Sequence, residues 1–320
     1  MRIRFWGTRG SLPVSASGHV IREKVKQALR LAEGRRFEND AQLERFIDES
    51  LDFPTKSGYG GDSSCVQIEA GEGYMICDMG TGLRRFVKQV VKEHGSEHPQ
   101  VYHFFMSHLH WDHIMGFPFF TPAYIPGNTI RIYGGHHAKE MEAAFRRQQS
   151  SPCFPVYWDQ LGADVSFTHL EVDRWYEINS FRVKIMRQAH QGGSFGYRFE
   201  KDEKSMIYST DAEHKQQSEK ETEAVIDFFR DADFVIFDAT YSLVDMITIK
   251  EDWGHSSNIV GVDLCLRAKV KHYCMFHHEP ALNDEMIYTI LQETKRYETL
   301  VNKGHSLKIS TAYDDLVIDI

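Results

Sequence analysis

The densest group of chemically active side chains lies at residues 107–116, which read Ser-His-Leu-His-Trp-Asp-His-Ile-Met-Gly. Three imidazoles and one carboxylate fall within six positions directly after an apolar run: His108, His110, Asp112 and His113. Imidazole nitrogen and carboxylate oxygen are ligands that suit Zn²⁺, and also Mn²⁺ or Fe. A polar loop with histidines placed by chance would be a poor explanation for so many potential ligands at the end of a strand. The segment therefore predicts a metal site.

The spacing within this group favours two metal positions. His108 and His110 point to the same side of a short extended segment, because side chains alternate along extended backbone. Asp112 and His113 lie on the turn that follows, from where they can face a second ion. The five cysteines are odd in number and form no CxxC motif, so we expect buried free thiols. The ligands must then come from histidine and carboxylate.

Four further polar residues each follow an apolar run that predicts a strand: Asp78, His190, Asp211 and His277. Each has an ordinary structural explanation when it is taken alone. His278 comes directly after His277, so the last of these positions has two candidates.

A carboxylate and a histidine suited to proton transfer lie later in the chain. Asp238 ends an apolar run in Asp-Ala-Thr-Tyr, and His255 precedes a predicted helix in Gly-His-Ser-Ser. A leaving alkoxide needs a proton donor with a pKa near the operating pH, and a histidine held by a carboxylate meets that need. Ser256 or Ser257 would cap the helix, whose N-terminus could also face a phosphate. The alternative is that His255 is a neighbour of the helix cap and does no chemistry.

The elements that must position these residues follow from hydrophobic periodicity. Strands are predicted at 1–7, 65–70, 74–78, 101–107, 129–133, 165–170, 181–189, 197–200, 206–210, 234–238, 272–276, 307–310 and 316–320. Helices are predicted at 83–94, 138–149, 219–230, 257–269 and 284–301, with two amphipathic helices within 19–51. Strand runs in both halves with helices between them predict two sheets covered by helices. We expect one domain over 1–320 with a helical insertion at about 13–57.

The HxHxDHxxG sequence at 108–116 resembles the first ligand motif of the metallo-β-lactamase superfamily. The residues listed above continue that resemblance in the same order: Asp78, His190, Asp211 and His277. The resemblance implies an α/β fold, an αββα sandwich of two mixed sheets flanked by helices. It covers nearly the whole chain except residues 13–57.

The resemblance also implies a role for each residue at a two-metal centre. His108, His110 and His190 would hold one ion. Asp112, His113 and His277 would hold the other. Asp211 would bridge the two ions, and Asp78 would orient the ligand loop without binding metal. The expected metal is Zn²⁺, with Mn²⁺ or Fe as alternatives.

Two further motifs resemble the phosphodiesterase branch of this superfamily, those at 238–241 and 254–257. That branch includes transfer-RNA 3′-processing endonucleases, phosphoribosyl cyclic phosphodiesterases of the phosphonate pathway and cyclic-nucleotide phosphodiesterases. The resemblance implies that a metal-bridging hydroxide attacks phosphorus while His255, supported by Asp238, protonates the leaving oxygen. Asp112 is the third catalytic residue that it implies. The expected substrate is a small cyclic phosphodiester, such as a cyclic nucleotide.

Three other functions share part of this pattern. An RNA-processing endonuclease of the same branch is disfavoured by the formal net charge of −9, because non-specific nucleic-acid binding needs a cationic surface. A hydrolase of lactones, thioesters or β-lactams would share the ligands but does not need Asp238 and His255. A metal-binding structural or sensor module would need neither of them.

Three segments are candidates for the pocket wall. Residues 7–11 and 60–65 resemble small-residue segments that line the pocket in this branch, and both also read as turns. Asp62 stands where the branch has asparagine, so no direct phosphate contact is implied there. The aromatic segment 151–158 either forms a lid that stacks on a ring or packs in the core.

The remaining expectations concern location and partners. No apolar run approaches the roughly 20 residues of a membrane helix, and the N-terminus lacks an apolar signal core. We therefore expect a cytoplasmic protein without membrane or extensive nucleic-acid contacts. Homodimers are common in the branch, so a homodimer is expected. The helices of 13–57 should pack against the sandwich or a partner subunit near the pocket mouth.

Overall fold

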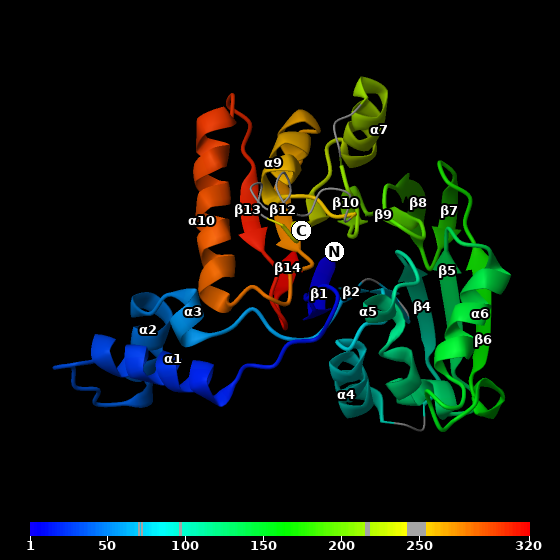
Figure 1. Ribbon diagram of the computed structural model, residues 1–320, viewed down its shortest axis with the longest axis horizontal. Helices are drawn as coiled ribbons and strands as arrows, with labels where there is room; N and C mark the ends of the chain where they lie inside the picture. The colour runs from blue at the N-terminus through cyan, green and yellow to red at the C-terminus, as the bar shows by residue number, and fades with distance from the viewer. Residues whose placement is uncertain (70, 72, 96–97, 215–217, 242–253) are drawn as a thin grey trace.

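The computed structural model describes residues 1–69, 71, 73–95, 98–214, 218–241 and 254–320, which form two seven-stranded sheets (Figure 1). The first sheet has the order β14 (Val317–Asp319), β1 (Arg2–Gly7), β2 (Cys65–Glu69), β3 (Tyr74–Cys77), β4 (Val101–Met106), β5 (Thr129–Gly134), β6 (Asp164–His169). The second has the order β13 (Lys308–Thr311), β12 (His272–Phe276), β11 (Phe234–Asp238), β10 (Lys204–Ser209), β9 (Ser194–Lys201), β8 (Phe181–Gln188), β7 (Trp175–Ile178). Both sheets are mixed, with β3 to β6 parallel in one and β10 to β13 parallel in the other.

The main core lies between the two sheets. Alternate side chains of a strand point to opposite faces, so one face of most strands contributes to this layer. The Phe5 ring of β1 packs against Phe234 of β11 and Phe276 of β12, with centroids 6.4 and 6.0 Å apart. On β4, Phe105 packs against Phe199 of β9 at 4.9 Å. These contacts join the halves of the chain into one sandwich.

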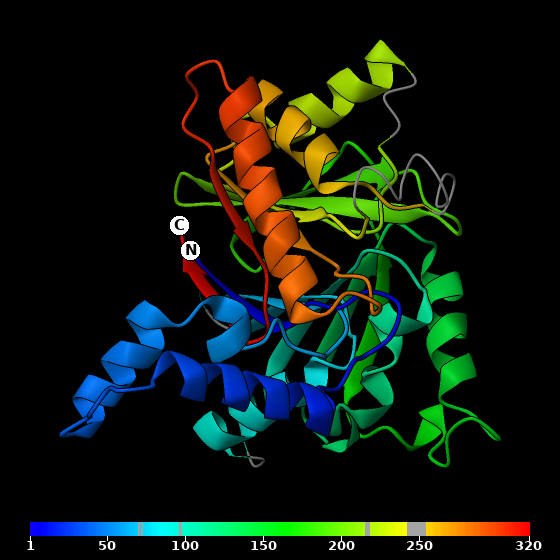
Figure 2. The same ribbon diagram turned by 60° about the vertical axis from the view of Figure 1, so that its left-hand side comes forward.

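Helices cover the outer face of each sheet, as Figure 2 shows. The first sheet carries α4 (Leu83–His94) and α6 (Ala138–Gln148), and the second carries α7 (Glu219–Phe229), α9 (Asn258–Arg267) and α10 (Asp284–Val301). In α4 the buried residues recur at helical spacing and face the sheet: Leu83, Phe86, Val87 and Val90. The four layers confirm the predicted αββα sandwich.

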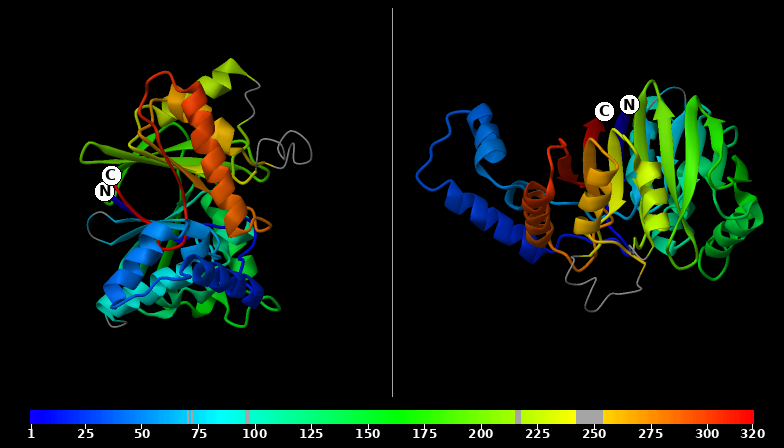
Figure 3. Two further views of the ribbon diagram at one scale, coloured as in Figure 1. Left: turned by 90° about the vertical axis from the view of Figure 1, so that its left-hand side faces the viewer. Right: turned by 90° about the horizontal axis from the view of Figure 1, so that it is seen from above.

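The segment between β1 and β2 contains α1 (Gly18–Leu31), α2 (Asp40–Ser50) and the short α3 (Phe53–Lys56). Figure 3 shows α1 and α2 standing away from the sandwich. The last part packs closely, since the Phe53 ring lies 4.6 Å from Tyr59 and 4.8 Å from Tyr313, and Lys24 of α1 forms an ion pair with Asp284 at the start of α10. No side chain of α1 is fully buried. The described residues therefore leave the apolar face that the sequence predicts largely uncovered.

The structure differs from the predicted strands at two places, and one predicted residue lies outside the described ranges. Strand β7 is absent from the predicted strands because it is a four-residue edge strand, too short to show a periodic pattern. Strand β9 begins at Ser194, three residues early, because its first residues pair with the end of β8. Residue 70, in the predicted strand 65–70, lies outside the described residues.

The cysteine expectation holds for four of the five thiols. Cys153 is exposed, whereas the others are buried and free: Cys65, Cys77, Cys265 and Cys274. Within the described ranges, no helix is long and apolar enough to cross a membrane.

Candidate metal centre

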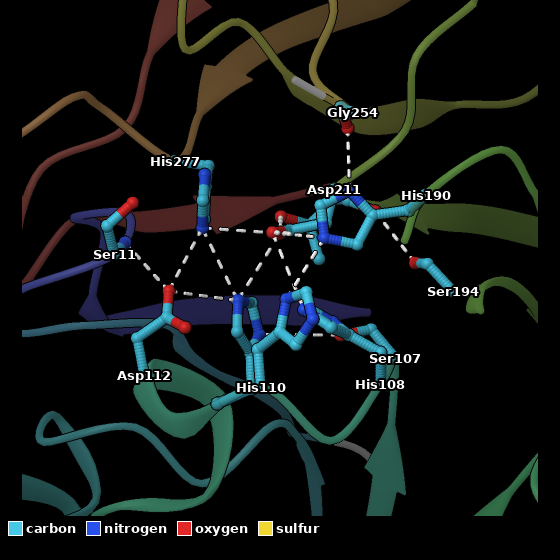
Figure 4. A network of polar contacts seen from close by, with 12 residues as sticks. Ser11, Ser107, His108, His110, Asp112, His190, Ser194, Asp211, Gly254 and His277 are labelled. Atoms are coloured by element: carbon cyan, nitrogen blue, oxygen red, sulfur yellow. Dashed lines mark hydrogen bonds and ion pairs between the residues drawn. The ribbon is translucent and has the colours of Figure 1, made fainter. Parts of the chain in front are cut away.

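Three neighbouring parallel strands of the second sheet end beside the candidate centre. Asp211 follows β10 by two residues, Asp238 closes β11, and His277 comes directly after β12. The carboxyl ends of parallel neighbours meet at one edge of a sheet, where ligands commonly bind. From the first sheet, the segment 108–113 follows β4 and includes the short helix α5 (Trp111–Ile114). The chain thus brings the predicted ligands to one place (Figure 4).

We call His108, His110 and His190 the open group. One ring nitrogen of each and a carboxylate oxygen of Asp211 all lie within 4.8 Å of one another. His190 Nε2 lies 3.1 Å from His110 Nδ1, and His108 Nε2 lies 3.6 Å from Asp211 Oδ2. His110 is exposed, so this group borders solvent on that side, while the side chain of His190 is only 5% exposed.

We call Asp112, His113 and His277 the closed group, because all three are buried. One ligand atom from each lies within 4.8 Å of the others. Asp112 Oδ2 is 3.2 Å from His113 Nε2 and 3.4 Å from His277 Nε2. The two Nε2 atoms face each other at 3.3 Å.

Asp211 stands between the two groups and turns one oxygen to each. Its Oδ2 lies 3.6 and 3.7 Å from His108 Nε2 and His190 Nε2. Its Oδ1 lies 3.3 and 3.2 Å from His113 Nε2 and His277 Nε2. A carboxylate in this position can contact two ions at once.

The donor atoms of both groups are suited to binding divalent metal ions and are not all satisfied by hydrogen bonds to one another. His108 is 1% exposed, yet its Nε2 has no hydrogen-bond partner, a deficit that costs about 1–3 kcal/mol for a buried polar group. Burial, and then His113, hold the pKa of His108 well below its ordinary value. Burial also lowers the pKa values of His110 and His190. Neutral imidazoles with free lone pairs are what metal binding requires.

The electric field around His113 also favours a cation. Burial alone would lower the pKa of His113, but Asp112, Asp211 and Asp78 raise it well above its ordinary value. These three carboxylates concentrate negative charge in a buried volume. A divalent ion would neutralise that charge.

Asp78 lies behind the closed group and holds it in place. Its Oδ2 is 2.7 Å from His113 Nδ1 and accepts hydrogen bonds from Ser107 Oγ at 2.6 Å and Tyr208 OH at 2.8 Å. It belongs to none of the groups able to hold an ion among the described residues. This is the orienting position that the resemblance implied.

Asp78, Asp211 and His277 share an unusual backbone conformation. Their φ angles are 59°, 47° and 62°, in the left-handed region. Each such residue costs about 1–3 kcal/mol and persists only where its surroundings enforce it, most often at functional sites. The strand ends are thus held in strained conformations that direct these side chains inward.

The N-terminal loop supports the closed group in a way that sequence reasoning missed. The backbone N–H of Ser11 donates to Asp112 Oδ2 at 2.7 Å. A methyl group at Gly10 would lie 2.4 Å from the His277 ring, so only glycine allows this approach. The loop is held by Arg9, which is 4% exposed and donates to the carbonyl oxygen of Leu282 at 2.8 Å. The Gly-Thr-Arg-Gly-Ser sequence after β1 was the available signal.

His255 and Asp238 form a buried pair beside both groups. His255 Nδ1 lies 2.8 Å from Asp238 Oδ2, and Asp238 is fully buried. Burial alone would lower the pKa of His255, but Asp238 overrides it and raises the pKa to about 9. The His255 ring lies 5.3 Å from the His190 ring and 5.1 Å from the His277 ring, between centroids. Asp211, His255 and His277 also come close enough to hold an ion.

The two candidates at the end of β12 are placed differently. His277 faces the closed group, whereas His278 Nε2 lies 2.9 Å from the carbonyl oxygen of Ala312, and its ring packs against Tyr59. His278 belongs to none of the possible ion-holding groups found among the described residues.

The segments proposed as pocket walls contain residues with different surroundings. Asp62 turns its Oδ1 toward the Thr81 hydroxyl, which donates at 2.8 Å. In the aromatic segment, Trp158 stacks on Phe117 with centroids 5.5 Å apart, while Tyr157 is 52% exposed. Two adjacent residues of this segment therefore differ, since Trp158 packs against Phe117 whereas Tyr157 meets solvent.

Comparison with known proteins places the chain in a family. The family described as the beta-lactamase superfamily domain matches residues 74–278. Ribonuclease Z of Oceanobacillus iheyensis is 22% identical over 240 residues, which cover 60% of this chain and 76% of that protein. The metallo-beta-lactamase fold protein YhfI of Bacillus subtilis has a TM-score of 0.64 at 13% identity, covering 99% of this chain and 98% of its own. A diphosphatase of the PhnP family has a TM-score of 0.60 at 17% identity, covering 100% and 97%.

At these identities the solved structures show the fold alone. The family match carries more, because it extends from β3 to His278 and so includes Asp211 and every residue of the open and closed groups. It spans well over half of the chain and confirms the resemblance that the ligand motif suggested. The chain therefore belongs to the metallo-β-lactamase superfamily of hydrolases.

Proposed function

We propose that this chain is a dinuclear metal-dependent phosphodiesterase whose substrate is a small cyclic phosphodiester, such as a cyclic nucleotide. The observation that carries the proposal is the buried pair of His255 and Asp238, which lies beside both groups of candidate ligands. Hydrolysis of a lactone or β-lactam needs the ligands but not a separate, carboxylate-held proton donor.

The open group, the closed group and Asp211 are the proposed ligands. Geometry supports two ions, since Asp211 presents a different oxygen to each group. Zn²⁺ is the proposed metal because the donors are imidazole nitrogen and carboxylate oxygen. When bound, the ions would neutralise the phosphoryl oxygens and lower the pKa of a water nucleophile.

His255 is the proposed general acid. Its Nδ1 is occupied by Asp238, which leaves Nε2 to carry the transferred proton. The raised pKa of His255 keeps the ring protonated at neutral pH, as a donor to a leaving oxygen must be. Asp238 also accepts the backbone N–H of Ala212, so the carboxylate that orients His255 is itself fixed.

A small substrate fits the charge of the chain. The formal net charge is −9, and residues 13–57 contain eight Lys and Arg residues against eight Asp and Glu residues. Gripping a long polyanion requires many cationic contacts, whereas a single phosphodiester can be bound by local positive charge.

The decisive experiment compares substrates of different size and chemistry. Wild-type protein loaded with Zn²⁺ or Mn²⁺ would be given cyclic nucleotides, linear dinucleotides, precursor transfer RNA and lactones, with chelator-treated protein as the control. We expect the highest kcat/KM for a cyclic nucleotide and none after chelation. Lactone hydrolysis without phosphodiester turnover would contradict the proposal.

An RNA-processing endonuclease is the second candidate, and one observation favours it. The relative from Oceanobacillus iheyensis is named Ribonuclease Z. Cleavage of precursor transfer RNA with a higher kcat/KM than any cyclic nucleotide would select this function over the first.

We also propose that two copies of the chain associate through α1 and α2. Ile21, Val25 and Leu29 form an exposed apolar stripe on α1. The charges of the two helices are complementary: α1 has four Lys and Arg residues and one Glu, and α2 has four Asp and Glu residues and one Arg. A twofold axis could place α1 of one copy against α2 of the other.

The oligomeric state tests this arrangement. Leu29→Lys should convert a dimer into a monomer in sedimentation velocity. Leu300→Lys, at an exposed leucine on α10, serves as the matched control and should leave the dimer intact. A wild-type monomer at micromolar concentration would contradict the proposed dimer.

A further inference from the structure

Thr240 lies at the contact between the closed group and the His255–Asp238 pair. It is 2% exposed and follows the end of β11 by two residues. Its Oγ1 is 2.6 Å from Asp238 Oδ1, 2.7 Å from the carbonyl oxygen of His277, and 3.0 Å from His277 Nδ1. One hydroxyl therefore touches both a proposed metal ligand and the carboxylate that holds the proposed acid.

The Thr240 hydroxyl has a single hydrogen, and its contacts determine the tautomer of His277. A threonine hydroxyl has one hydrogen to donate and two lone pairs. The carboxylate of Asp238 and the carbonyl of His277 can only accept, so the hydrogen points at one of them. Toward His277 Nδ1 the hydroxyl must then accept, which requires Nδ1 to carry the ring hydrogen. The lone pair of His277 is thereby left on Nε2.

Nε2 is the nitrogen that faces the closed group. It lies 3.4 Å from Asp112 Oδ2 and 3.2 Å from Asp211 Oδ1. The opposite tautomer would direct a hydrogen into the space where an ion would sit. The hydroxyl also contacts the backbone of His277, whose φ is 62°, so it supports the strained conformation that turns the ring inward.

The same hydroxyl restrains the proton donor. Asp238 Oδ1 contacts the Thr240 hydroxyl and accepts the Thr240 backbone N–H at 3.1 Å, while its Oδ2 contacts His255. His277, Thr240, Asp238 and His255 thus form one continuous chain of contacts.

We infer that Thr240 is a positioning residue that presents the Nε2 lone pair of His277 to the closed-group metal and aligns Asp238 behind His255. The inference rests on the proposed ligand set and general acid. It goes beyond them because it makes metal affinity and proton donation depend on one hydroxyl that contacts neither substrate nor metal.

The first test measures metal binding without substrate. Metal-free wild type, Thr240→Val, Thr240→Ser and Thr222→Val would be titrated with Zn²⁺ against a chromophoric chelator. Thr222 is a matched control, because this buried residue donates its hydroxyl hydrogen to the carbonyl of Ser218, the N-cap of α7, outside both ligand groups. We expect two ions in wild type, Thr240→Ser and Thr222→Val. In Thr240→Val one ion should bind as in wild type and the other about 10–100-fold more weakly, as is typical when the partner of a metal ligand is removed.

The second test measures turnover at saturating metal. Thr240→Val should lose more kcat on a phosphodiester with an alkoxide leaving group than on bis(p-nitrophenyl) phosphate, whose leaving group needs little protonation. Thr240→Ser should restore the wild-type ratio. Thr240→Ala, which leaves room for a water molecule, replaces the valine variant should that variant not fold.

The outcomes separate this inference from the proposed function. Wild-type affinity for both ions in Thr240→Val, or equal weakening of both, would overturn the role at His277. Equal kcat losses on the two esters would overturn the role at Asp238. If wild type binds two ions but hydrolyses no phosphodiester, the proposed function fails, while selective weakening of one ion still supports Thr240 as the residue that positions His277.

Discussion

The open and closed groups have similar donor atoms but very different surroundings. His113 is held through Nδ1 by Asp78, His277 by Thr240, and Asp112 by the backbone of Ser11. In the open group, His110 is exposed, and His190 Nδ1 lies 2.7 Å from the carbonyl oxygen of Gly254. The closed group is thus supported by two buried side chains and one backbone N–H, whereas the open group combines the buried His108 with His110, which solvent can reach.

The difference indicates separate roles for the two groups in metal binding and substrate approach. Ligands that are already fixed lose little conformational freedom when an ion binds, so the closed group should bind its metal tightly. The open group borders solvent and is therefore the side from which a substrate would approach. His255 lies beside both, with its ring 5.3 Å from His190 and 5.1 Å from His277.

The largest effect should come from removing the residue that the groups share. Asp211→Ala deletes the carboxylate that faces both, so we expect loss of both ions and a fall of activity to the uncatalysed rate. The metal content of the variant, purified without chelator, measures the loss of ions. Wild type purified in the same way is the control and should approach two ions per chain. Retention of one ion at wild-type affinity would show that the groups are independent and that Asp211 does not bridge them.

The next largest effect concerns the residue between the groups. His255→Ala should keep both ions and the fold but lose about 10²–10⁴-fold in kcat on phosphodiesters with alkoxide leaving groups. The loss of kcat on bis(p-nitrophenyl) phosphate should be much smaller. The ratio of the two losses in one metal-replete variant is the measurement. Equal losses would assign His255 another role, and a lost ion would assign it, with Asp211 and His277, to the metal centre.

Two glycines allow each group to be disturbed separately. A methyl group at Gly10 would lie 2.4 Å from His277 Nδ1, and one at Gly254 would lie 2.4 Å from His190 Nδ1. We expect Gly10→Ala to weaken only the closed-group ion and Gly254→Ala only the open-group ion, each by about 10–100-fold. Titration with Zn²⁺ against a competing chelator reports both affinities. If either variant weakened both ions equally, the division into two groups would be wrong.

The smallest effect probes the support behind the closed group. Tyr208→Phe removes one of the hydrogen bonds to Asp78 and should weaken the closed-group ion by about 0.5–1.5 kcal/mol, which is a factor of roughly 2–10. Tyr197→Phe is the control, because the buried Tyr197 hydroxyl donates to the carbonyl of Met106 instead. Both variants should leave the open-group ion unchanged. A larger loss in Tyr197→Phe would mean that general packing, not Asp78, sets the affinity.

Local sequence predicted much of the fold because periodicity is a local property. Alternation and apolar runs located the strands of both sheets, and helical spacing located α4, α6, α7, α9 and α10. Strand β7 was not predicted because four residues at the edge of a sheet are too few to show a periodic pattern. The early start of β9 was not predicted because pairing with β8 defines it. Both features depend on neighbours in space.

The sequence by itself determined the chemistry available to this protein. Residue types and their order after strand ends, above all the segment 108–113, specify nitrogen and oxygen donors, and the family match confirms the fold that gathers them. Only the tertiary structure decided how those donors are divided and supported. That Asp211 faces both groups, that His277 and not His278 turns inward, and that the hydroxyl of Thr240 selects a tautomer are all set by contacts between distant residues. Such contacts leave no periodic pattern in the sequence, because they depend on where strand ends meet and not on how each strand forms.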